Sequence, residues 1–233
     1  PTGITVYEGE LLPEAFHGQV IHCDAGPNVV RAYPVKPEGA GYSAEILNLM
    51  VGELDKWFRP ADVCVAPDGS LFVTDWYDPG VGGHQMGDVE RGRLFRVAPP
   101  GSKYIVPEFD FATPAGAVAA LRNPNLSVRF MAWKAIEKFG AAASIDLANL
   151  AIDDDPRIRA RALWAEGKLL GVQAGRAAVG TALSDEDENV RMMGIRLARQ
   201  LKLPDFHVQV VNDRSPAVRR ELAIALPHDP SAP

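Results

Sequence analysis

Residues 59–98 read RPADVCVAPDGSLFVTDWYDPGVGGHQMGDVERGRLFRVAP, and this stretch decides how the first half of the chain is interpreted. Apolar residues alternate with other residues in two short runs, 63–66 and 71–75, on either side of a Pro-Asp-Gly turn at 67–69. Such alternation is typical of half-buried strands joined by a turn. A third run, 93–98, follows a long loop rich in glycine and charged residues. The pattern predicts three antiparallel strands that resemble one blade of a β-propeller.

An internal repeat extends this interpretation to residues 1–112. The segments GQVIHCD at 18–24 and GSLFVTD at 69–75 share the form Gly-x-apolar-apolar-x-x-Asp and lie 51 residues apart. A propeller blade takes about 40–50 residues, and a propeller closes with roughly 4–8 blades. We therefore expect about two terminal blades of a longer propeller, and we interpret the chain as an internal fragment whose earlier blades lie outside it.

Residues 113–228 change to a helical period. An apolar residue followed by arginine recurs at a spacing of about 30 residues, and an Asn or Asp stands five positions before each apolar residue. The arginines are Arg129, Arg159, Arg191 and Arg219, and the upstream residues are Asn123, Asp153, Asp185 and Asp213. Helix pairs at this spacing predict an α-solenoid of short HEAT-like repeats. The whole is an α+β multidomain chain, and residues 229–233 are expected to be a disordered tail.

The repeated arginines allow two interpretations. They could form a stripe that binds a ligand, or they could pair with the upstream Asp and Asn residues in a ladder of charge-assisted hydrogen bonds between repeats. The regular spacing favours the ladder.

Charge and composition exclude some classes of protein. The 233 residues carry a net charge of −6, whereas nucleic-acid binders usually need a basic surface. No apolar run approaches the ~20 residues that span a bilayer, so no transmembrane segment is predicted. Cys23 and Cys64 each alternate with apolar neighbours in a predicted strand, which favours two buried small side chains over a disulfide.

The loop 75–93 is where chemistry is expected. Four carboxylates against two arginines leave it slightly anionic, which suits a hard cation bound by oxygen ligands. Asp75, Asp78 and Asp88 are the candidate ligands, and His84 is the candidate general base. The other interpretation is a solvated glycine-rich loop whose charges pair with one another.

Arg59 precedes the first strand of the predicted blade and also has two interpretations. Its guanidinium could enter a central channel and bind an anionic cofactor, or it could pair with Asp62 at the entrance to the blade. The ion pair is favoured.

The strings HCDAGPNVVRAYPV and WFRPADVCVAPDGSLFVTDWYDPGVGGHQMGD…RGRLFRVAP resemble a family of large bacterial membrane-bound dehydrogenase-like proteins with a haem-binding CxxCH domain. Their propeller is similar to that of quinoprotein sugar dehydrogenases, and HEAT-like repeats and a cytochrome c domain follow it. The resemblance implies Arg59, Trp76 and Tyr77 as cofactor-binding residues, Asp75, Asp78 and Asp88 as metal ligands, and His84 as the catalytic residue. It also implies pyrroloquinoline quinone and Ca²⁺ in the full-length parent, haem c on a domain absent here, and a periplasmic or exported location.

Two functions follow. The first is a fragment of a quinoprotein-like dehydrogenase of the sugar or alcohol type, inactive alone, which would pass electrons to the haem domain. Its partners would be the remaining blades, the cytochrome c domain and a sugar-like substrate. The second is a non-catalytic propeller and HEAT scaffold that binds protein or polysaccharide.

Overall fold

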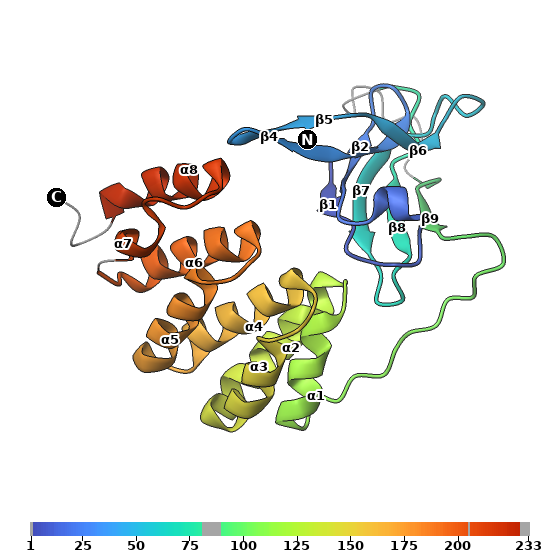
Figure 1. Ribbon diagram of the computed structural model, residues 1–233. Helices are drawn as coiled ribbons and strands as arrows, with labels where there is room; N and C mark the ends of the chain where they lie inside the picture. The colour runs from blue at the N-terminus through green and yellow to red at the C-terminus, as the bar shows by residue number, and fades with distance from the viewer. Residues whose placement is uncertain (1, 81–89, 205, 229–233) are drawn as a thin grey trace. The chain divides into compact units, whose positions relative to one another are not determined.

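The computed structural model describes residues 2–80, 90–204 and 206–228 (Figure 1). The chain divides into two compact units. The first comprises residues 1–36, 42–108 and 123–128, and the second comprises residues 37–41, 109–122 and 129–233. Antiparallel strands build the first unit, and helices build the second.

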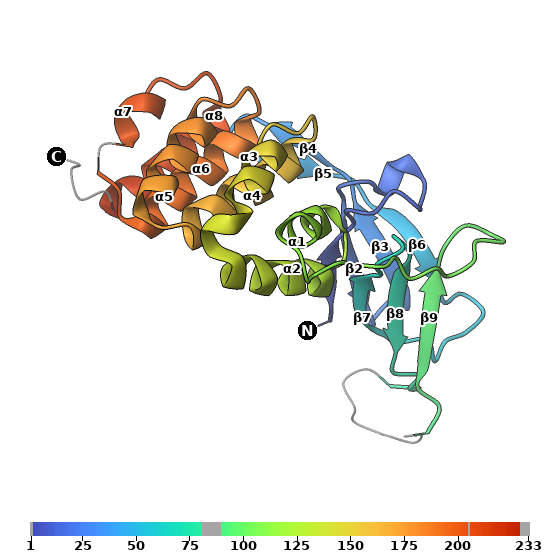
Figure 2. The same ribbon diagram turned by 90° about the horizontal axis from the view of Figure 1, so that it is seen from below.

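The described strands of the first unit form two main sheets, both antiparallel. One has the order β1-β2-β3-β6, with β1 (Ile4–Val6), β2 (Val20–Asp24), β3 (Val29–Tyr33) and β6 (Leu47–Val51). The other has the order β7-β8-β9, with β7 (Pro60–Val65), β8 (Leu71–Asp75) and β9 (Arg93–Val97), which Figure 2 shows side by side. A separate hairpin pairs β4 (Val35–Glu38) with β5 (Gly41–Ala44), and a short 3₁₀ helix, η1, spans Glu14–Phe16.

Both main sheets contribute to one hydrophobic core. Alternate residues of each strand point inward, because successive side chains of a strand face opposite sides. The buried members from β2, β3, β7 and β8 are Ile21, Cys23, Val30, Ala32, Val63, Val65, Leu71 and Val73. Tyr7, Leu12 and Phe58 complete the buried cluster from the connecting segments.

Backbone just before β1 joins the two sheets. The N–H of Gly3 donates to the carbonyl oxygen of Ala61 at 2.7 Å, and the carbonyl oxygen of Gly3 accepts from the N–H of Cys23 at 3.0 Å. A Cβ at Gly3 would lie 2.6 Å from the Cα of Asp62. Glycine is therefore required for this approach of strands.

The predicted turn at 67–69 is confirmed, and Tyr7 anchors it. Gly69 has a φ of +85°, and the N–H of Ala66 donates to the carbonyl oxygen of Ser70 at 2.7 Å. The hydroxyl of the fully buried Tyr7 donates to the carbonyl oxygen of Gly69 at 2.7 Å and accepts from the N–H of Leu12 at 2.8 Å. Burial raises the pKa of Tyr7. The hydroxyl thus satisfies a carbonyl oxygen of the turn and a backbone N–H of the segment after β1.

The second unit is a succession of helices. The first three residues of its helix α2 are assigned to the first unit. The longer helices are α2 (Leu126–Phe139), α4 (Pro156–Leu169), α5 (Val172–Leu183), α6 (Glu188–Leu201) and α8 (Pro216–Ala225). The shorter ones are α1 (Pro114–Ala119), α3 (Ser144–Leu150) and α7 (His207–Val210), with 3₁₀ turns η2 (Ala120–Arg122), η3 (Gly140–Ala143) and η4 (Leu226–His228). Side-chain oxygens of Asp155, Asp187 and Ser215 cap the starts of α4, α6 and α8.

The predicted fold class, a partial β-propeller followed by an α-solenoid of HEAT-like repeats, is wrong. The described strands form several antiparallel sheets that close into neither a barrel nor a propeller, and the described helices do not establish the solenoid. Periodicity located individual elements well, since β8 occupies the predicted 71–75. It cannot report how strands from distant segments share sheets, because hydrogen bonds between those segments decide it. Thus β1 and β6 bring the first described sheet to four strands, whereas the second has three.

The cysteines divide between the two faces of their sheets. Cys23 is fully buried, as predicted, and burial raises its pKa to about 12. Cys64 is exposed, so its predicted burial is wrong: its neighbours Val63 and Val65 take the inward positions of β7. Both are free thiols.

None of the helices within the described ranges is long and apolar enough to cross a membrane.

Candidate functional site

Several polar and aromatic side chains meet at the edge of the β7-β8-β9 sheet where β7 and β9 begin and β8 ends. Asp75 ends β8, and the strand register places it opposite Pro60 of β7 and Arg93 of β9. We call the residues gathered there the loop-root cluster: Trp57, Arg59, Asp75, Tyr77, Asp78 and Arg93.

Asp75 is the centre of the loop-root cluster, and hydrogen bonds use its full capacity. Its Oδ1 accepts from the backbone N–H of Arg59 at 2.7 Å and of Tyr77 at 3.0 Å. Its Oδ2 lies 2.6 Å from both Nε and Nη2 of Arg93. A carboxylate offers about four acceptor positions, so these contacts leave none for a metal ion.

Arg93 bridges two carboxylates. Besides Asp75, its Nη2 lies 2.7 Å from Oδ2 of Asp55. Burial acts to lower the pKa of Arg93, but the hydrogen bonds that it donates to the carboxylates of Asp55 and Asp75 outweigh this effect and raise the pKa. Arg93 therefore stays charged and ties the start of β9 to the end of β8.

Asp78 is fully buried but only half satisfied. Its Oδ1 accepts from the N–H of Gly80 at 2.7 Å, and its own N–H donates to the carbonyl oxygen of Trp57 at 3.0 Å. Its Oδ2 has no hydrogen-bond partner among the described residues. Tyr77, just before it, has a φ of +52°, a left-handed conformation that costs a non-glycine residue about 1–2 kcal/mol. A strained backbone beside an unsatisfied buried carboxylate is typical of a functional position.

Arg59 is nine-tenths buried and touches only backbone oxygens. Its Nη1 approaches the carbonyl oxygens of Ala25 at 3.4 Å and Phe58 at 3.3 Å, and its Nη2 approaches that of Pro79 at 3.3 Å. Its Nε has no partner, and no ion pair to a carboxylate is present in the described part of the chain. The favoured Arg59–Asp62 ion pair is therefore wrong. A buried guanidinium without a counter-ion is costly unless an anion joins it.

Aromatic rings and arginines alternate at the outer side of the cluster. The rings of Trp57 and Tyr77 have centroids 5.5 Å apart, and the Arg93 guanidinium lies 4.0 Å from the Tyr77 centroid. Arg91 lies 5.8 Å from the Trp57 centroid. Trp57 is 37% exposed and Trp76 is 53% exposed. Stacked Arg and aromatic groups that reach solvent can contact a partner or a ligand.

The structure thus brings together four of the predicted site residues: Arg59, Asp75, Tyr77 and Asp78. Trp76 faces solvent, and the contact it makes with the cluster is its N–H to the carbonyl oxygen of Arg59 at 2.9 Å. His84 and Asp88 lie outside the described residues. Within the described ranges no group of three or more His, Cys, Asp or Glu side chains could hold a metal ion.

Sequence reasoning missed Asp55 and Trp57 and gave Arg93 no role. Both missed residues come just before Arg59, in the string DKWFRP, but only the tertiary contact with Arg93 and Tyr77 gives them a place in the site. The signal in the sequence was an Asp four residues and a Trp two residues before Arg59.

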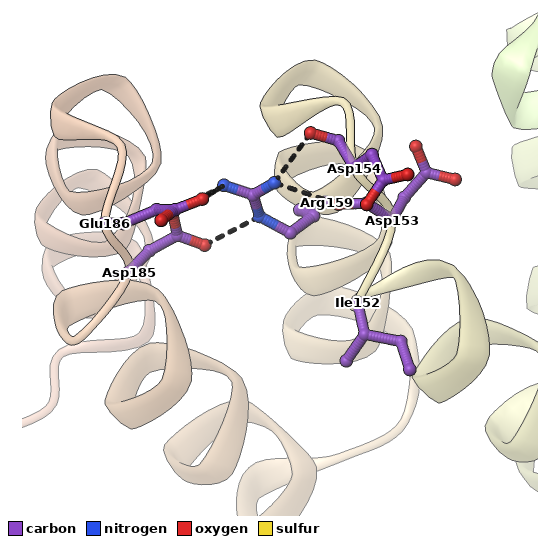
Figure 3. Close-up of a pocket in the computed structure, with 6 residues that line it drawn as sticks. All are labelled: Ile152, Asp153, Asp154, Arg159, Asp185 and Glu186. Atoms are coloured by element: carbon purple, nitrogen blue, oxygen red, sulfur yellow. Dashed lines mark hydrogen bonds and ion pairs between the residues drawn. The ribbon is translucent and has the colours of Figure 1, made fainter.

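A second polar hollow lies in the helical unit. A cavity of about 310 Å³ is lined by Ile152, Asp153, Asp154, Arg159, Asp185 and Glu186, as Figure 3 shows. Arg159 crosses it and donates to both carboxylate oxygens of Asp185, at 2.9 and 2.7 Å. This contact confirms the predicted ladder between repeated segments at this rung. Because Arg159 is occupied by Asp185 and by backbone carbonyl oxygens, we interpret the cavity as a structural feature of the helical unit.

Comparison with known proteins adds one match. A family model described as a domain of unknown function, DUF7133, matches residues 1–99. That range covers the strands and the loop-root cluster. No curated protein matches the chain.

Proposed function

We propose that the first unit is part of a quinoprotein-like dehydrogenase in which Arg59 holds an anionic cofactor. The observation that carries this proposal is the state of Arg59: its guanidinium is buried, pairs with no carboxylate among the described residues, and keeps an unpartnered Nε. Such a group is stabilised by a bound carboxylate, ideally through parallel N–H···O bonds. Pyrroloquinoline quinone carries carboxylates, and when bound it would accept electrons from a sugar or alcohol.

The residues of the site fit an organic anion better than they fit calcium. Arg59 has N–H groups to offer, and Oδ2 of Asp78, which has no donor among the described residues, could accept from a hydroxyl. Asp75, by contrast, is occupied by Arg93 and by two backbone N–H groups. We therefore assign no step to a calcium ion. Transfer of electrons to a haem domain, and export of the protein, belong to the same proposal.

Titration calorimetry with pyrroloquinoline quinone tests this assignment. We expect the chain to bind it, and Arg59→Gln to weaken binding by at least tenfold, because no carboxylate of the described residues pairs with this buried guanidinium. Arg176 is an exposed arginine of α5, so Arg176→Gln is the matched control and should bind as tightly as the unsubstituted chain. Absence of binding by the unsubstituted chain, or equal affinity in a folded Arg59→Gln variant, would refute the proposal.

A second function, non-catalytic binding of protein or polysaccharide, is favoured by one further observation. Trp57 reaches solvent with Arg91 over its ring, and Trp76 is exposed next to Asp75 of the cluster. Trp, Tyr and Arg are the residues that dominate binding energy at protein interfaces. Dextran and carboxymethyl cellulose can be titrated while tryptophan fluorescence is recorded. A saturable change that Trp76→Ala removes would support this function, and no change with either polymer would exclude polysaccharides of these types.

A further inference from the structure

The outer edge of the β7-β8-β9 sheet is strand β9, and the hydrogen-bond pattern identifies the backbone groups that face outward there. The N–H of Ala66 donates to the carbonyl oxygen of Ser70 at 2.7 Å, and the N–H of Trp76 donates to that of Arg59 at 2.9 Å. Each bond links the β7 and β8 segments through an even-numbered residue on the β8 side. Hydrogen-bonded residues alternate along an antiparallel strand, so the odd-numbered residues of β8 bond to β9.

The backbone N–H and C=O groups of Leu94 and Arg96 therefore point away from the sheet. Phe95, between them, lies opposite Val73 and turns its own backbone groups to β8. Among the described residues, no group forms a hydrogen bond with the four outward groups of Leu94 and Arg96. We call this side of the strand the β9 edge.

The β9 edge lacks the features that usually prevent the addition of a strand. Edge strands are commonly protected by proline, by a β-bulge or by unpaired charges. β9 contains no proline, pairs with β8 without a shift in register, and carries Leu94, which is 64% exposed. Its two arginines are each paired with a carboxylate of the same unit. Residues 98–108 follow β9 in this unit and form no strand beside it.

The hydrophobic core is incompletely covered next to the β9 edge. Leu71 and Val73 of β8 are fully buried, whereas Phe95 and Val97 of β9 are only partly buried against the same core. On the other sheet, the partly buried core residues of β6 are Leu47, Leu49 and Met50. Burial thus declines toward β9 in one sheet and toward β6 in the other.

β6 and β9 lie at the same end of this core. A Cβ at Gly52, directly after β6, would lie 3.0 Å from the Cβ of Phe58, whose ring centroid is 5.9 Å from that of Phe95. At the opposite end, β1 and β2 contact β7. Figure 2 shows β2, β3 and β6 following one another in the same direction as β7, β8 and β9. Because the first sheet has one strand more, β6 faces a position beside β9 that no described strand occupies.

We propose that the β9 edge binds an extended peptide segment of a partner protein as an added antiparallel strand. The outward groups of Leu94 and Arg96 supply two donors and two acceptors, which the backbone of an extended peptide matches. Residues that lie opposite each other in a sheet share a face, so the partner residue opposite Phe95 points into the core. Its side chain is apolar, because it meets Phe95 and the partly buried residues of β6. The partner segment therefore alternates apolar residues with polar ones.

A second copy of the chain fits this edge less well than a single strand does. Pairing of β9 with the β9 of another copy would use the outward groups of only two residues from each copy. Such a contact is much smaller than the roughly 1,200 Å² that stable interfaces bury. A single strand can instead enter beside β9 and cover the partly buried residues of both sheets, without placing a second folded unit against β6.

The probe is the peptide acetyl-KTLTVTLTK-amide, whose monomeric state is established by analytical ultracentrifugation before use. It is titrated into the full chain while the backbone amide signals of Leu94 and Arg96 are followed by NMR. We expect saturable shifts of both signals and slower hydrogen exchange of both amides in the complex, whereas the amide of Phe95 is protected without peptide. N-methylation of the two central threonines should abolish binding, because their N–H groups face β9. N-methylation of the two leucines leaves those bonds intact and is the matched control.

Variants of the chain, with their folding established by circular dichroism, complete the test. Leu94→Pro removes one outward N–H and leaves the bonds from β9 to β8, so it should weaken peptide binding at least tenfold. Leu94→Thr keeps the N–H and should bind within twofold of the unsubstituted chain. Arg59→Gln should bind the peptide equally well, so the result is independent of the proposed cofactor site.

Three outcomes would overturn the proposal. The first is the absence of saturable shifts at millimolar peptide. The second is equal binding of the two N-methylated peptides, or undiminished binding by folded Leu94→Pro. The third is protection of the Leu94 and Arg96 amides in the chain alone, whether as a monomer or as a dimer, because the β9 edge would then be covered by the chain itself or by a second copy.

Discussion

The side chain of Asp75 is wholly inaccessible to solvent, and Arg93 closes it off with two nitrogens that each lie 2.6 Å from Oδ2. The pair joins the last residue of β8 to the first residue of β9. Two backbone N–H groups bind the other oxygen, so the carboxylate is satisfied without any ligand. Asp75 therefore organises the site and does not coordinate a metal.

Asp75→Asn should destabilise the chain by about 2–3 kcal/mol, because a buried charge-assisted hydrogen bond becomes a neutral one. The free energy of unfolding from urea denaturation measures this effect. Lys56→Ala, an exposed residue of the same unit, is the control and should change it by less than about 0.5 kcal/mol. A loss no larger than that of the control would show that the Arg93 contact contributes little.

Asp78→Asn should not lower the free energy of unfolding as Asp75→Asn does. The Oδ2 of Asp78 is buried without a donor among the described residues, so the hydration that this oxygen loses on folding is not replaced by a hydrogen bond there. The amide can keep the bond from Gly80 through its oxygen. We expect a free energy of unfolding that is unchanged or higher by roughly 1 kcal/mol in the same urea experiment. A loss as large as that of Asp75→Asn would mean that Asp78 has a stabilising partner.

Tyr7→Phe should cost about 2–3 kcal/mol of unfolding free energy. The substitution leaves the Gly69 carbonyl oxygen and the Leu12 N–H buried without their shared partner. Tyr42→Phe removes a hydroxyl from a side chain that is 52% exposed and should be nearly neutral. Thermal or urea unfolding of both variants decides the point, and equal effects would contradict the anchoring role of Tyr7.

Gly3→Ala should destabilise the first unit by about 1–3 kcal/mol, since its Cβ would meet the backbone of Asp62 and force the β1 and β7 segments apart. Gly180→Ala is the matched control, because a Cβ at that helical position of α5 meets nothing within 4 Å. That variant should gain about 0.5–1 kcal/mol from helix propensity. A neutral Gly3→Ala would show that the two sheets tolerate a wider separation.

The helical unit should lose stability in acid through its Asp–Arg ladder. Burial acts to raise the pKa of Asp185 and of Asp213, but hydrogen bonds from Arg159 and Arg191 outweigh it, so both pKa values are lowered. A carboxyl group whose folded pKa is depressed contributes stability above its unfolded pKa of about 3.9. That contribution is lost as the pH falls through the lower folded value.

Urea midpoints followed by far-ultraviolet circular dichroism between pH 7 and pH 2 measure this loss. The decline should begin below about pH 4. Arg159→Gln should lower the midpoint at pH 7 and flatten the decline, because Asp185 then keeps a more ordinary pKa. An unchanged acid profile in that variant would contradict the role of the ladder.

Local patterns in the sequence located most of the secondary structure. Alternation predicted β8 at its observed bounds, and the Pro-Asp-Gly turn has the positive φ that its glycine permits. The Arg–Asp spacing predicted the ladder that Arg159 and Arg191 make. These features depend on residues close in sequence or on a strict repeat, so composition and spacing are enough to determine them.

Tertiary contacts decided how the elements assemble and what each site residue does. The sequence suggested propeller blades, but the sheet order β1-β2-β3-β6 depends on hydrogen bonds between strands from separate segments, with β1 on β2 and β6 on β3. The sequence predicts Asp75 as a metal ligand, but in the structure its carboxylate accepts from Arg93, 18 residues later in the chain. Arg59 was expected to meet Asp62, three residues away, yet its side chain turns to the carbonyl oxygens of Ala25, Phe58 and Pro79. The direction of a side chain and the satisfaction of its hydrogen bonds depend on neighbours distant in sequence, which periodicity does not encode.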